Sequence, residues 1–245
     1  YGTIDATLLF LILIGRHAAW TGRLDLFKEL RSNIDAALAW MTDYGDVNGD
    51  GYLEYRRTSE QGLENQAWKD SKDAIVNVDG SLATPPIAPV EVQAYAYEAM
   101  TGMAELFRRA GERDRAERLS LDAADLRTRF NRDFWLDDKG CYALALQAGG
   151  KPAAVVSSNA GHVLWCGIAD EAKARRVAEC LTGESMFSGW GIRTLSANER
   201  RYNPMGYHLG TVWPHDNSLI AAGFRRYGYG QAAAQIFSGL LEAAL

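Results

Sequence analysis

The sequence predicts an all-α protein built from pairs of helices. Apolar residues recur at helical spacing in four successive pairs of segments. Long polar segments connect these pairs, and the longest cover residues 43–84 and 182–213. Helical bundles use short connections, whereas long loops in a compact domain usually have a function. The pattern therefore predicts a toroid of helical hairpins whose loops face a central cavity.

The first two pairs are set by glycine turns and by a proline cluster. The expected helices cover residues 5–20, 24–42, 85–109 and 113–130. Gly22 separates the first two helices and Gly111 the second two. Proline is favoured in the first turn of a helix, so Pro85, Pro86 and Pro89 set the start of the third helix.

The second half repeats this arrangement after a short β-hairpin. The hairpin is expected over residues 134–146, with its turn at Asp138-Lys139-Gly140. The helices that follow are expected over residues 158–166, 170–181, 215–226 and 231–245. Low-complexity segments and linkers are absent, which favours one domain over residues 1–245. The chain starts without Met, and its last helix has no stop signal, so we expect a truncated fragment of a longer protein.

Composition narrows the class of protein. The 245 residues are 47% hydrophobic and 23% charged, as in ordinary globular proteins. The net charge of -5 argues against nucleic acid or an anionic membrane as the main partner. The apolar run 8–14 is too short to span a bilayer, and it lacks the flanks of a secretion signal. The three scattered cysteines are expected to be buried free thiols, which favours a cytoplasmic protein.

The most informative motif is Asn65-Gln66-Ala67-Trp68-Lys69-Asp70-Ser71-Lys72-Asp73. On a helix, Asp70 and Asp73 would share one face, because three residues make almost one turn. An indole beside carboxyl and amide groups suits a carbohydrate, which offers apolar faces for stacking, hydroxyls, and a glycosidic oxygen that needs a proton donor. The alternative is a charged helix start, where both carboxylates favour the helix dipole.

A second motif resembles the first half of a calcium-binding loop. It has oxygen ligands at alternate positions and a glycine for the turn, in the sequence Asp46-x-Asn48-x-Asp50-Gly51-x-x-Glu54. A regular EF-hand is excluded because Arg57 stands where the twelfth-position glutamate belongs. Two interpretations remain: a calcium site completed by distant ligands, and a turn whose side chains cap their own backbone.

Three further parts of the chain contain polar residues that could belong to a site. Glu91 and Tyr95 lie one helical turn apart, so either both face a cavity or Glu91 is a first-turn dipole partner. His162 on an apolar helix is expected to be a buried residue with satisfied hydrogen bonds. His208 and His215 belong to the segment richest in aromatic residues, but they lack the helical spacing of a metal site. Nucleophile-elbow, phosphate-loop and dinucleotide motifs are absent.

Taken together, these strings resemble the bacterial glycogen-debranching-enzyme-like (amylo-α-1,6-glucosidase-like) proteins of the six-hairpin glycosidase superfamily. Processing α-glucosidase, trehalase and glucosylglycerate hydrolase are more distant relatives. The resemblance runs along the whole chain, through residues 1–7, 50–55, 65–73, 87–93 and 202–217. It implies an (α/α)6 toroid that hydrolyses an α-glycosidic bond with inversion and needs no cofactor. Debranching is the first expectation, and a small α-glucoside such as trehalose or glucosylglycerate is the alternative substrate.

The resemblance also implies catalytic roles. The processing-glucosidase pattern places the general acid at Asp73, whereas the debranching pattern would favour Asp70. The general base is expected beyond Leu245, because Glu199 and Glu242 do not lie in the family's base motif. A chain without its base should be nearly inactive. A non-catalytic carbohydrate-binding fragment is the rival interpretation.

The substrate-binding shell is expected to combine one carboxylate, stacking rings and several polar groups. Asp5 would bind sugar hydroxyls. The rings of Trp68, Tyr95 and Trp213 would stack on the sugar. The remaining candidates are Gln66, Lys69, Glu91 and His215. The expected ligand is an oligosaccharide or a small glucoside.

Overall fold

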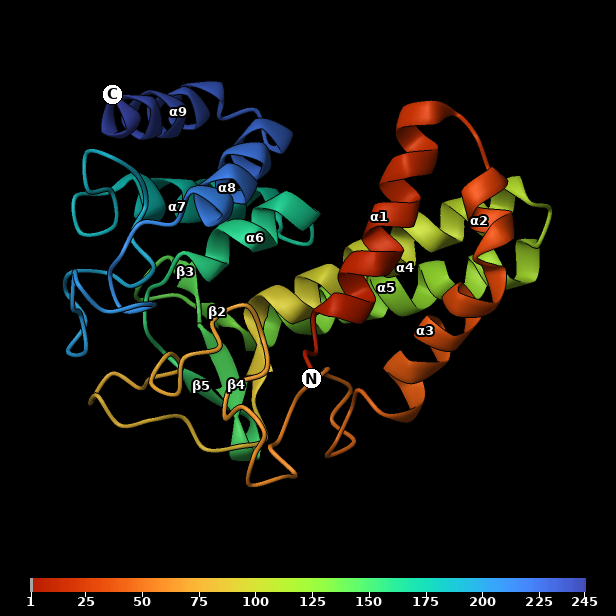
Figure 1. Ribbon diagram of the computed structural model, residues 1–245, viewed down its shortest axis with the longest axis horizontal. Helices are drawn as coiled ribbons and strands as arrows, with labels where there is room; N and C mark the ends of the chain where they lie inside the picture. The colour runs from red at the N-terminus through yellow and green to blue at the C-terminus, as the bar shows by residue number, and fades with distance from the viewer. Residues whose placement is uncertain (1) are drawn as a thin grey trace.

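The computed structural model describes residues 2–245, and within that range nine α-helices form four hairpins, because the second arm of the first hairpin is divided into two helices (Figure 1). The helices are α1 (Ala6–Thr21), α2 (Asp25–Glu29), α3 (Arg31–Asp43), α4 (Val90–Arg109), α5 (Arg113–Asp133), α6 (Asn159–Cys166), α7 (Glu171–Thr182), α8 (Pro214–Arg226) and α9 (Gly230–Ala244). Tyr1, the first residue of the family-like string 1–7, lies outside the described residues. The predicted all-α hairpin architecture is confirmed.

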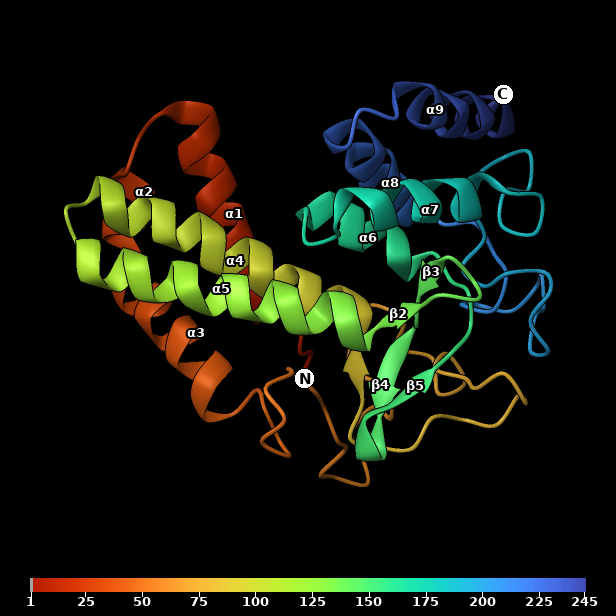
Figure 2. The ribbon, with the colours of Figure 1, turned by 180° about the vertical axis from the view of Figure 1, so that it is seen from behind.

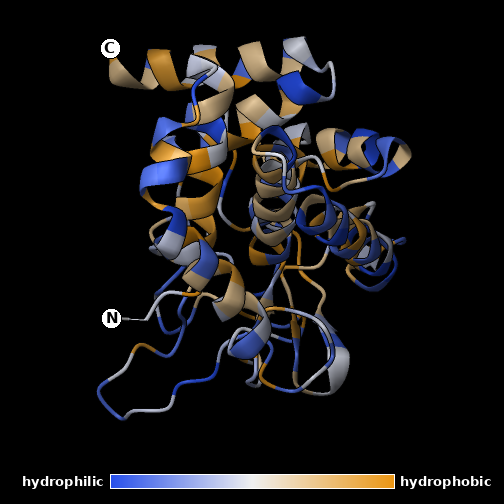
Figure 3. Ribbon diagram, turned by 90° about the vertical axis from the view of Figure 1, so that its right-hand side faces the viewer, coloured by the Kyte–Doolittle hydropathy of each residue, from blue (hydrophilic) through white to orange (hydrophobic). Residues whose placement is uncertain are grey.

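The helices are arranged in an inner row and an outer row. Helix α1 packs on α4, α4 on α6, and α6 on α8. The outer helices pair with these, as Figure 2 shows for α4 and α5, which run side by side. Hydrophobic residues concentrate in the helices, whereas the long loops are mostly hydrophilic (Figure 3). No helix among residues 2–245 is long and apolar enough to cross a membrane.

Five short strands complete the described fold, and β2, β4 and β5 lie below helices α6 to α9 in Figure 1. Strands β1 (Ala88–Pro89), β4 (Ala145–Gln147) and β5 (Lys151–Ala153) form an antiparallel sheet in the order β1-β4-β5. Strands β2 (Trp135–Leu136) and β3 (Cys141–Tyr142) form the predicted hairpin, and the positive φ of Gly140, 61°, closes its turn. The sheet fixes the chain immediately before α4.

Two predicted helix boundaries were wrong. The expected helix 24–42 is divided at Leu30, where φ is -93° and ψ is 19°. The apolar stripe through Phe27 and Ile34 continues across this break, so periodicity alone could not reveal it. Helix α4 starts at Val90 rather than at Pro85, because a residue that precedes proline is pushed out of the helical region.

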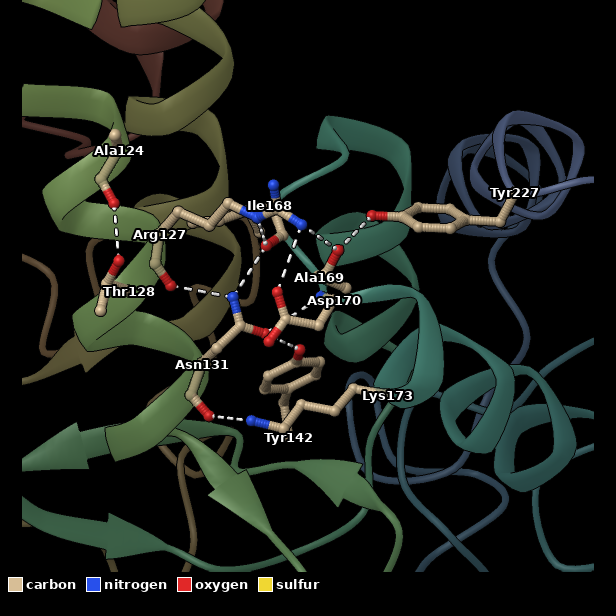
Figure 4. Close-up of polar contacts among 10 residues, drawn as sticks. All are labelled: Ala124, Arg127, Thr128, Asn131, Tyr142, Ile168, Ala169, Asp170, Lys173 and Tyr227. Atoms are coloured by element: carbon tan, nitrogen blue, oxygen red, sulfur yellow. Dashed lines mark hydrogen bonds and ion pairs between the residues drawn. The ribbon is translucent and has the colours of Figure 1, made fainter. Parts of the chain in front are cut away.

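A buried asparagine joins three parts of the fold (Figure 4). Asn131 on α5 donates from Nδ2 to the Arg127 and Ile168 carbonyl oxygens. Its Oδ1 accepts the Tyr142 hydroxyl at 2.6 Å and the Asp170 backbone N–H at 3.1 Å. This one amide therefore connects α5, β3 and the turn between α6 and α7, with its hydrogen-bonding capacity filled.

Close backbone contacts hold the inner helices together. A Cβ atom added at Gly161 of α6 would lie 2.4 Å from Cγ1 of Ile220 on α8. One added at Gly223 of α8 would lie 2.6 Å from the backbone nitrogen of Trp165. Such separations exclude any side chain, so glycine sets the spacing of α6 and α8. That spacing positions the site described next.

Candidate active site

Residues 65–73 form a loop within the long polar connection expected at 43–84, so Asp70 and Asp73 do not share a helical face. Asn65 accounts for this conformation. Its Oδ1 accepts the Tyr55 hydroxyl at 2.7 Å, and its Nδ2 donates to the Ser71 carbonyl oxygen at 2.7 Å. Side chain–backbone bonds of this kind offer the chain an alternative to the helix. The side chain of Asn65 therefore holds the loop in a bent conformation, and Asp70 and Asp73 lie on this loop.

Trp68 lies at the centre of an aromatic cluster. Its ring is stacked on His162, with centroids 5.7 Å apart and planes 12° apart. It meets His215 edge-on at 5.0 Å and His208 at 5.4 Å. His208 in turn stacks on Trp213 at 5.7 Å. Residues from the loop 65–73, from α6 and from both sides of the start of α8 thus form one aromatic surface, which suits the apolar face of a sugar.

A buried hydrogen-bonded chain supports this cluster from below. The Tyr95 hydroxyl lies 2.5 Å from Nδ1 of His162, and Nε2 of His162 lies 2.7 Å from Oδ1 of Asp216. These three residues come from the inner helices α4, α6 and α8. His162 is buried with both nitrogens satisfied, as the sequence predicts. Its role beneath Trp68, and the contribution of Asp216, were not predicted.

Lys69 and Glu91 are buried behind Trp68 rather than exposed beside it. The Lys69 Nζ atom donates to the Thr194 carbonyl oxygen at 2.6 Å and lies 5.1 Å from the Trp68 ring centroid. Burial lowers the pKa of Lys69 to about 8, while the charges of Asp216 and Glu91 act in the opposite direction. Burial also raises the pKa of Glu91, although Asn159 donates to its Oε2 at 2.9 Å.

Carboxylates and a histidine surround the exposed edge of the loop. Asp70 is exposed, and Oδ2 of the partly exposed Asp73 lies 4.0 Å from Nη2 of Arg201. The Ser71 hydroxyl, between the two aspartates in sequence, lies 2.9 Å from Nδ1 of His208. Burial lowers the pKa of His208 to about 4, and the nearby Lys69 charge adds to this effect. His208 is therefore neutral in neutral solution.

Asp5, at the start of α1, faces the same loop. Its side chain is buried, and the backbone N–H of the preceding Ile4 donates to the Gln66 carbonyl oxygen at 2.8 Å. Burial raises the pKa of Asp5, and the negative charge of Asp70 adds to the effect. Asp5 and Asp70 thus lie near each other, although 64 residues separate them in the sequence.

The remaining predicted substrate-binding residues are Gln66, Trp213 and His215, and they differ in how close they lie to Trp68. Gln66 is half-buried, and its side chain bonds within its own loop, to the Leu63 carbonyl oxygen. Trp213 precedes α8 and donates from Nε1 to the Tyr207 carbonyl oxygen at 2.9 Å. His215 lies in the first turn of α8, where burial lowers its pKa. The structure therefore brings Trp68, Trp213 and His215 together and leaves Gln66 at the edge.

The two glutamates considered as bases lie elsewhere. Oε1 of Glu199 accepts bonds from Lys139 Nζ and from the Val156 backbone N–H, both at 3.0 Å. Its carboxylate is therefore committed to the turn of the β2–β3 hairpin. Glu242 lies exposed on α9. Glu199 therefore has the surroundings of a structural residue, and Glu242 has those of a surface residue.

Comparison with known proteins gives one family and several similar folds. Residues 13–244 match the family model described as "Mannosylglycerate hydrolase MGH1-like glycoside hydrolase domain". A GH63 mannosylglycerate hydrolase from Thermus thermophilus has a similar fold, with a TM-score of 0.55 and 20% identity over 64% of this chain and 37% of that one. Neutral trehalase Nth1 from Saccharomyces cerevisiae also has a similar fold, with a TM-score of 0.57 and 15% identity over 63% of this chain and 30% of that one.

A third solved structure, named "Sialidase", matches more of the chain. Its TM-score is 0.72 with 13% identity, over 91% of this chain and 20% of that one. At these identities the solved structures show the fold, which is that of the six-hairpin glycosidases. The chain spans 37% of the length of the mannosylglycerate hydrolase that it matches.

Proposed function

Since the chain belongs to the family of mannosylglycerate hydrolase MGH1-like glycoside hydrolase domains, we propose that it forms the sugar-binding and proton-donating part of an inverting hydrolase of a small α-glycoside. The observation that carries the proposal is the aromatic surface around Trp68, directly beside a turn that presents two aspartates. An aromatic platform binds the sugar, and an adjacent carboxylic acid can protonate the glycosidic oxygen.

Asp73 is the proposed general acid, and Asp70 is the alternative. Inverting hydrolysis needs a protonated carboxyl group at the leaving oxygen and a carboxylate on the opposite face that activates water. Asp73 and Asp70 bracket Ser71, whose hydroxyl is held by His208, so the turn that carries both is fixed in place. The base role is assigned to neither Glu199 nor Glu242, because neither carboxylate lies in the aromatic cluster.

The proposed substrate is a small glycoside rather than a glycogen branch. The solved structures named above are a mannosylglycerate hydrolase and a trehalase, and both names denote small substrates. Arg201 offers a cationic side chain 4.0 Å from Asp73, where an anionic aglycone such as glycerate would leave. Asp5, whose side chain is buried near Asp70, would bind sugar hydroxyls. Debranching of an α-1,6-linked oligosaccharide is the competing function.

The test is hydrolysis of a substrate panel by this chain and by the natural polypeptide that contains it. The panel holds glucosylglycerate, mannosylglycerate, trehalose and an α-1,6-branched oligosaccharide, with NMR detection of the anomer released first. Asp73→Asn should lower turnover by about 10²–10⁴-fold. Asp79→Asn, at an exposed aspartate of the next turn, is the matched control and should leave turnover intact.

Three results would change the proposal. Loss of activity in Asp70→Asn but not in Asp73→Asn would move the acid role to Asp70. Turnover of the branched oligosaccharide alone would establish debranching. Sugar binding without hydrolysis of any substrate, by both polypeptides, would establish a carbohydrate-binding module.

A further inference from the structure

We propose that Cys180 is an oxidation site for hydroperoxides and that Cys141 converts the oxidised form into a disulfide. The two cysteines belong to different elements, since Cys141 is the first residue of β3 and Cys180 lies in the last turn of α7. Helix α7 packs against β3 (Figure 2). The fold therefore brings together two thiols that lie far apart in the sequence.

Several contacts fix α7 on the β2–β3 hairpin beside the two cysteines. One helical turn before Cys180, Arg176 donates to Oδ1 of Asp137 at 2.8 Å and to the Asp137 carbonyl oxygen at 2.6 Å. A Cβ atom added at Gly140, the residue before Cys141, would lie 3.1 Å from Nε of Arg176. Residues four apart share one face of a helix, so Cys180 also faces this hairpin.

The two thiols form a hydrogen bond with each other, and this bond favours ionisation of Cys180. Because the Cys141 thiol donates to the Cys180 sulfur, it lowers the pKa of Cys180 below the ordinary thiol value of 9.0. Burial opposes this effect, as does the charge of Glu199, whereas the charge of Lys139 adds to it. The same bond, together with burial, raises the pKa of Cys141. The pair thus contains one nucleophile and one protonated partner.

Exposure distinguishes the two cysteines in the same way. Cys141 is fully buried, whereas Cys180 is half-buried, so a small oxidant reaches Cys180 first. Redox-sensing cysteines combine a lowered pKa, partial exposure and a neighbouring second cysteine. Cys166, at the end of α6, is fully buried and its pKa is raised by burial. The sequence-based expectation of buried thiols therefore holds for Cys141 and Cys166 but was wrong for Cys180.

The proposed reaction consumes one molecule of hydroperoxide. The Cys180 thiolate attacks a peroxide oxygen, the O–O bond breaks, and Cys180 becomes a sulfenic acid while the other oxygen leaves as water. The Cys141 sulfur then loses its proton and attacks the Cys180 sulfur. The S–S bond forms, the S–O bond breaks, and the hydroxyl group leaves as a second water molecule. Two thiols thus lose two electrons and two protons, and hydrogen peroxide gains them.

The disulfide would join the hairpin covalently to α7, on the side of the fold that supports α6. Lys139, in the hairpin turn, donates to Oε1 of Glu199, and the same oxygen accepts the Val156 backbone N–H. Val156 lies in the segment before α6, and α6 carries His162 beneath the aromatic cluster. A cross-link restricts the unfolded chain. We therefore expect the oxidised chain to be more stable than the reduced one.

The test treats the reduced 245-residue chain with equimolar hydrogen peroxide and counts free thiols after denaturation. The count should fall from three thiols to one, and peptide mapping by mass spectrometry should place the remaining thiol at Cys166. Cys180→Ala should slow thiol loss at least about tenfold. Cys141→Ala should stop at the sulfenic acid, which dimedone labels. Cys166→Ala is the matched control and should form the disulfide at the wild-type rate.

Two further measurements separate an oxidation site from two thiols that merely pack together. The oxidation rate of the wild type should reach half its maximum below pH 9.0. Cys141→Ala should move this midpoint to higher pH, because it removes the hydrogen-bond donor to Cys180. Oxidation of the wild type should raise the midpoint of thermal unfolding by about 4 °C or more, and dithiothreitol should reverse the change.

Four results would overturn the proposal. These are the loss of no thiol or of only one, a disulfide that includes Cys166, a disulfide between two chains, and equal rates of thiol loss in the wild type and Cys180→Ala. If Cys141→Ala does not fold, the wild-type thiol count, the peptide map and Cys180→Ala still decide the question. None of these measurements depends on glycosidase activity.

Discussion

The Nε2 atom of His162 lies 2.7 Å from Oδ1 of Asp216, and both side chains are buried from solvent. The Tyr95 hydroxyl occupies the other ring nitrogen. Both ends of the imidazole are thus fixed, and with them the plane on which Trp68 stacks. Since the three supporting residues belong to inner helices and are buried, the aromatic surface of the site rests on regular secondary structure rather than on a loop.

Asp216→Asn should lower the free energy of unfolding by about 1–3 kcal/mol. The amide has nearly the same shape, but it loses the charge that strengthens the bond to His162. It also introduces two N–H donors at a buried position, where the present Oδ2 has no partner within residues 2–245. Urea denaturation followed by far-ultraviolet circular dichroism measures the change.

Asp138→Asn is the control for this substitution. Asp138 lies exposed in the turn of the β2–β3 hairpin, so its variant should stay within about 0.5 kcal/mol of the wild type. If Asp216→Asn were equally neutral, the His162–Asp216 bond would be dispensable for folding.

His208 should make stability depend on pH. Its pKa is about 4 in the folded protein, against 6.5 for an ordinary imidazole. Between these values the unfolded state binds more protons, so the contribution of His208 is fully present above pH 6.5 and is lost as the pH falls toward 4. His208→Gln should reduce the slope of unfolding free energy against pH over this window by about 1 kcal/mol per pH unit.

The measurement is urea denaturation of both proteins at several values between about pH 4.5 and 7, the window in which the two states differ in bound protons. His17→Gln removes an imidazole outside the cluster and should reproduce the wild-type slope. Identical slopes for His208→Gln and the wild type would show that folding leaves the titration of His208 unchanged.

Lys69→Met should destabilise the fold by about 2–4 kcal/mol. Methionine replaces most of the unbranched lysine side chain and ends one atom short of it. It leaves the Thr194 carbonyl oxygen without its donor and removes a positive charge near the buried Glu91 and Asp216. The loop that contains Thr194 should also become more accessible, which hydrogen exchange of the residues around it would detect.

Lys72→Met provides the matched comparison. Lys72 lies three residues away in the same loop and is exposed, so its replacement should change stability by less than about 0.5 kcal/mol. Equal effects of the two substitutions on stability would show that the hydrogen bond from Lys69 to the Thr194 carbonyl oxygen does not stabilise the fold.

The helices could be predicted because each buries one regular apolar stripe, which appears in the sequence as a periodic pattern. The conformation of residues 65–73 could not be predicted, because it depends on hydrogen bonds of Asn65 with Tyr55 and Ser71 rather than on any periodic pattern. Trp68 could be identified from its neighbours in sequence. Asp216 could not, since its importance arises from a contact with His162, 54 residues earlier, that only the packing of α6 against α8 creates.

The packing of α6 against α8 leads to the last prediction, for Gly223→Ala. An alanine Cβ would lie 2.6 Å from the Trp165 backbone nitrogen and 2.9 Å from the Leu164 carbonyl carbon. Backbone atoms cannot move aside as a flexible side chain would, so the two helices must separate. We expect a loss of about 3 kcal/mol, together with a weaker His162–Asp216 bond, because that bond spans the same interface.

Gly230→Ala separates this steric effect from the general effect of replacing a helical glycine. Among residues 2–245, no atom other than those of its chain neighbours and of its own helix backbone lies within 4 Å of a Cβ built at Gly230, the first residue of α9. Alanine there should stabilise the chain by about 0.5 kcal/mol, since it restricts the unfolded state. Thermal and urea denaturation should therefore shift the two variants in opposite directions. A Gly223→Ala protein as stable as Gly230→Ala would mean that α6 and α8 are not in backbone contact.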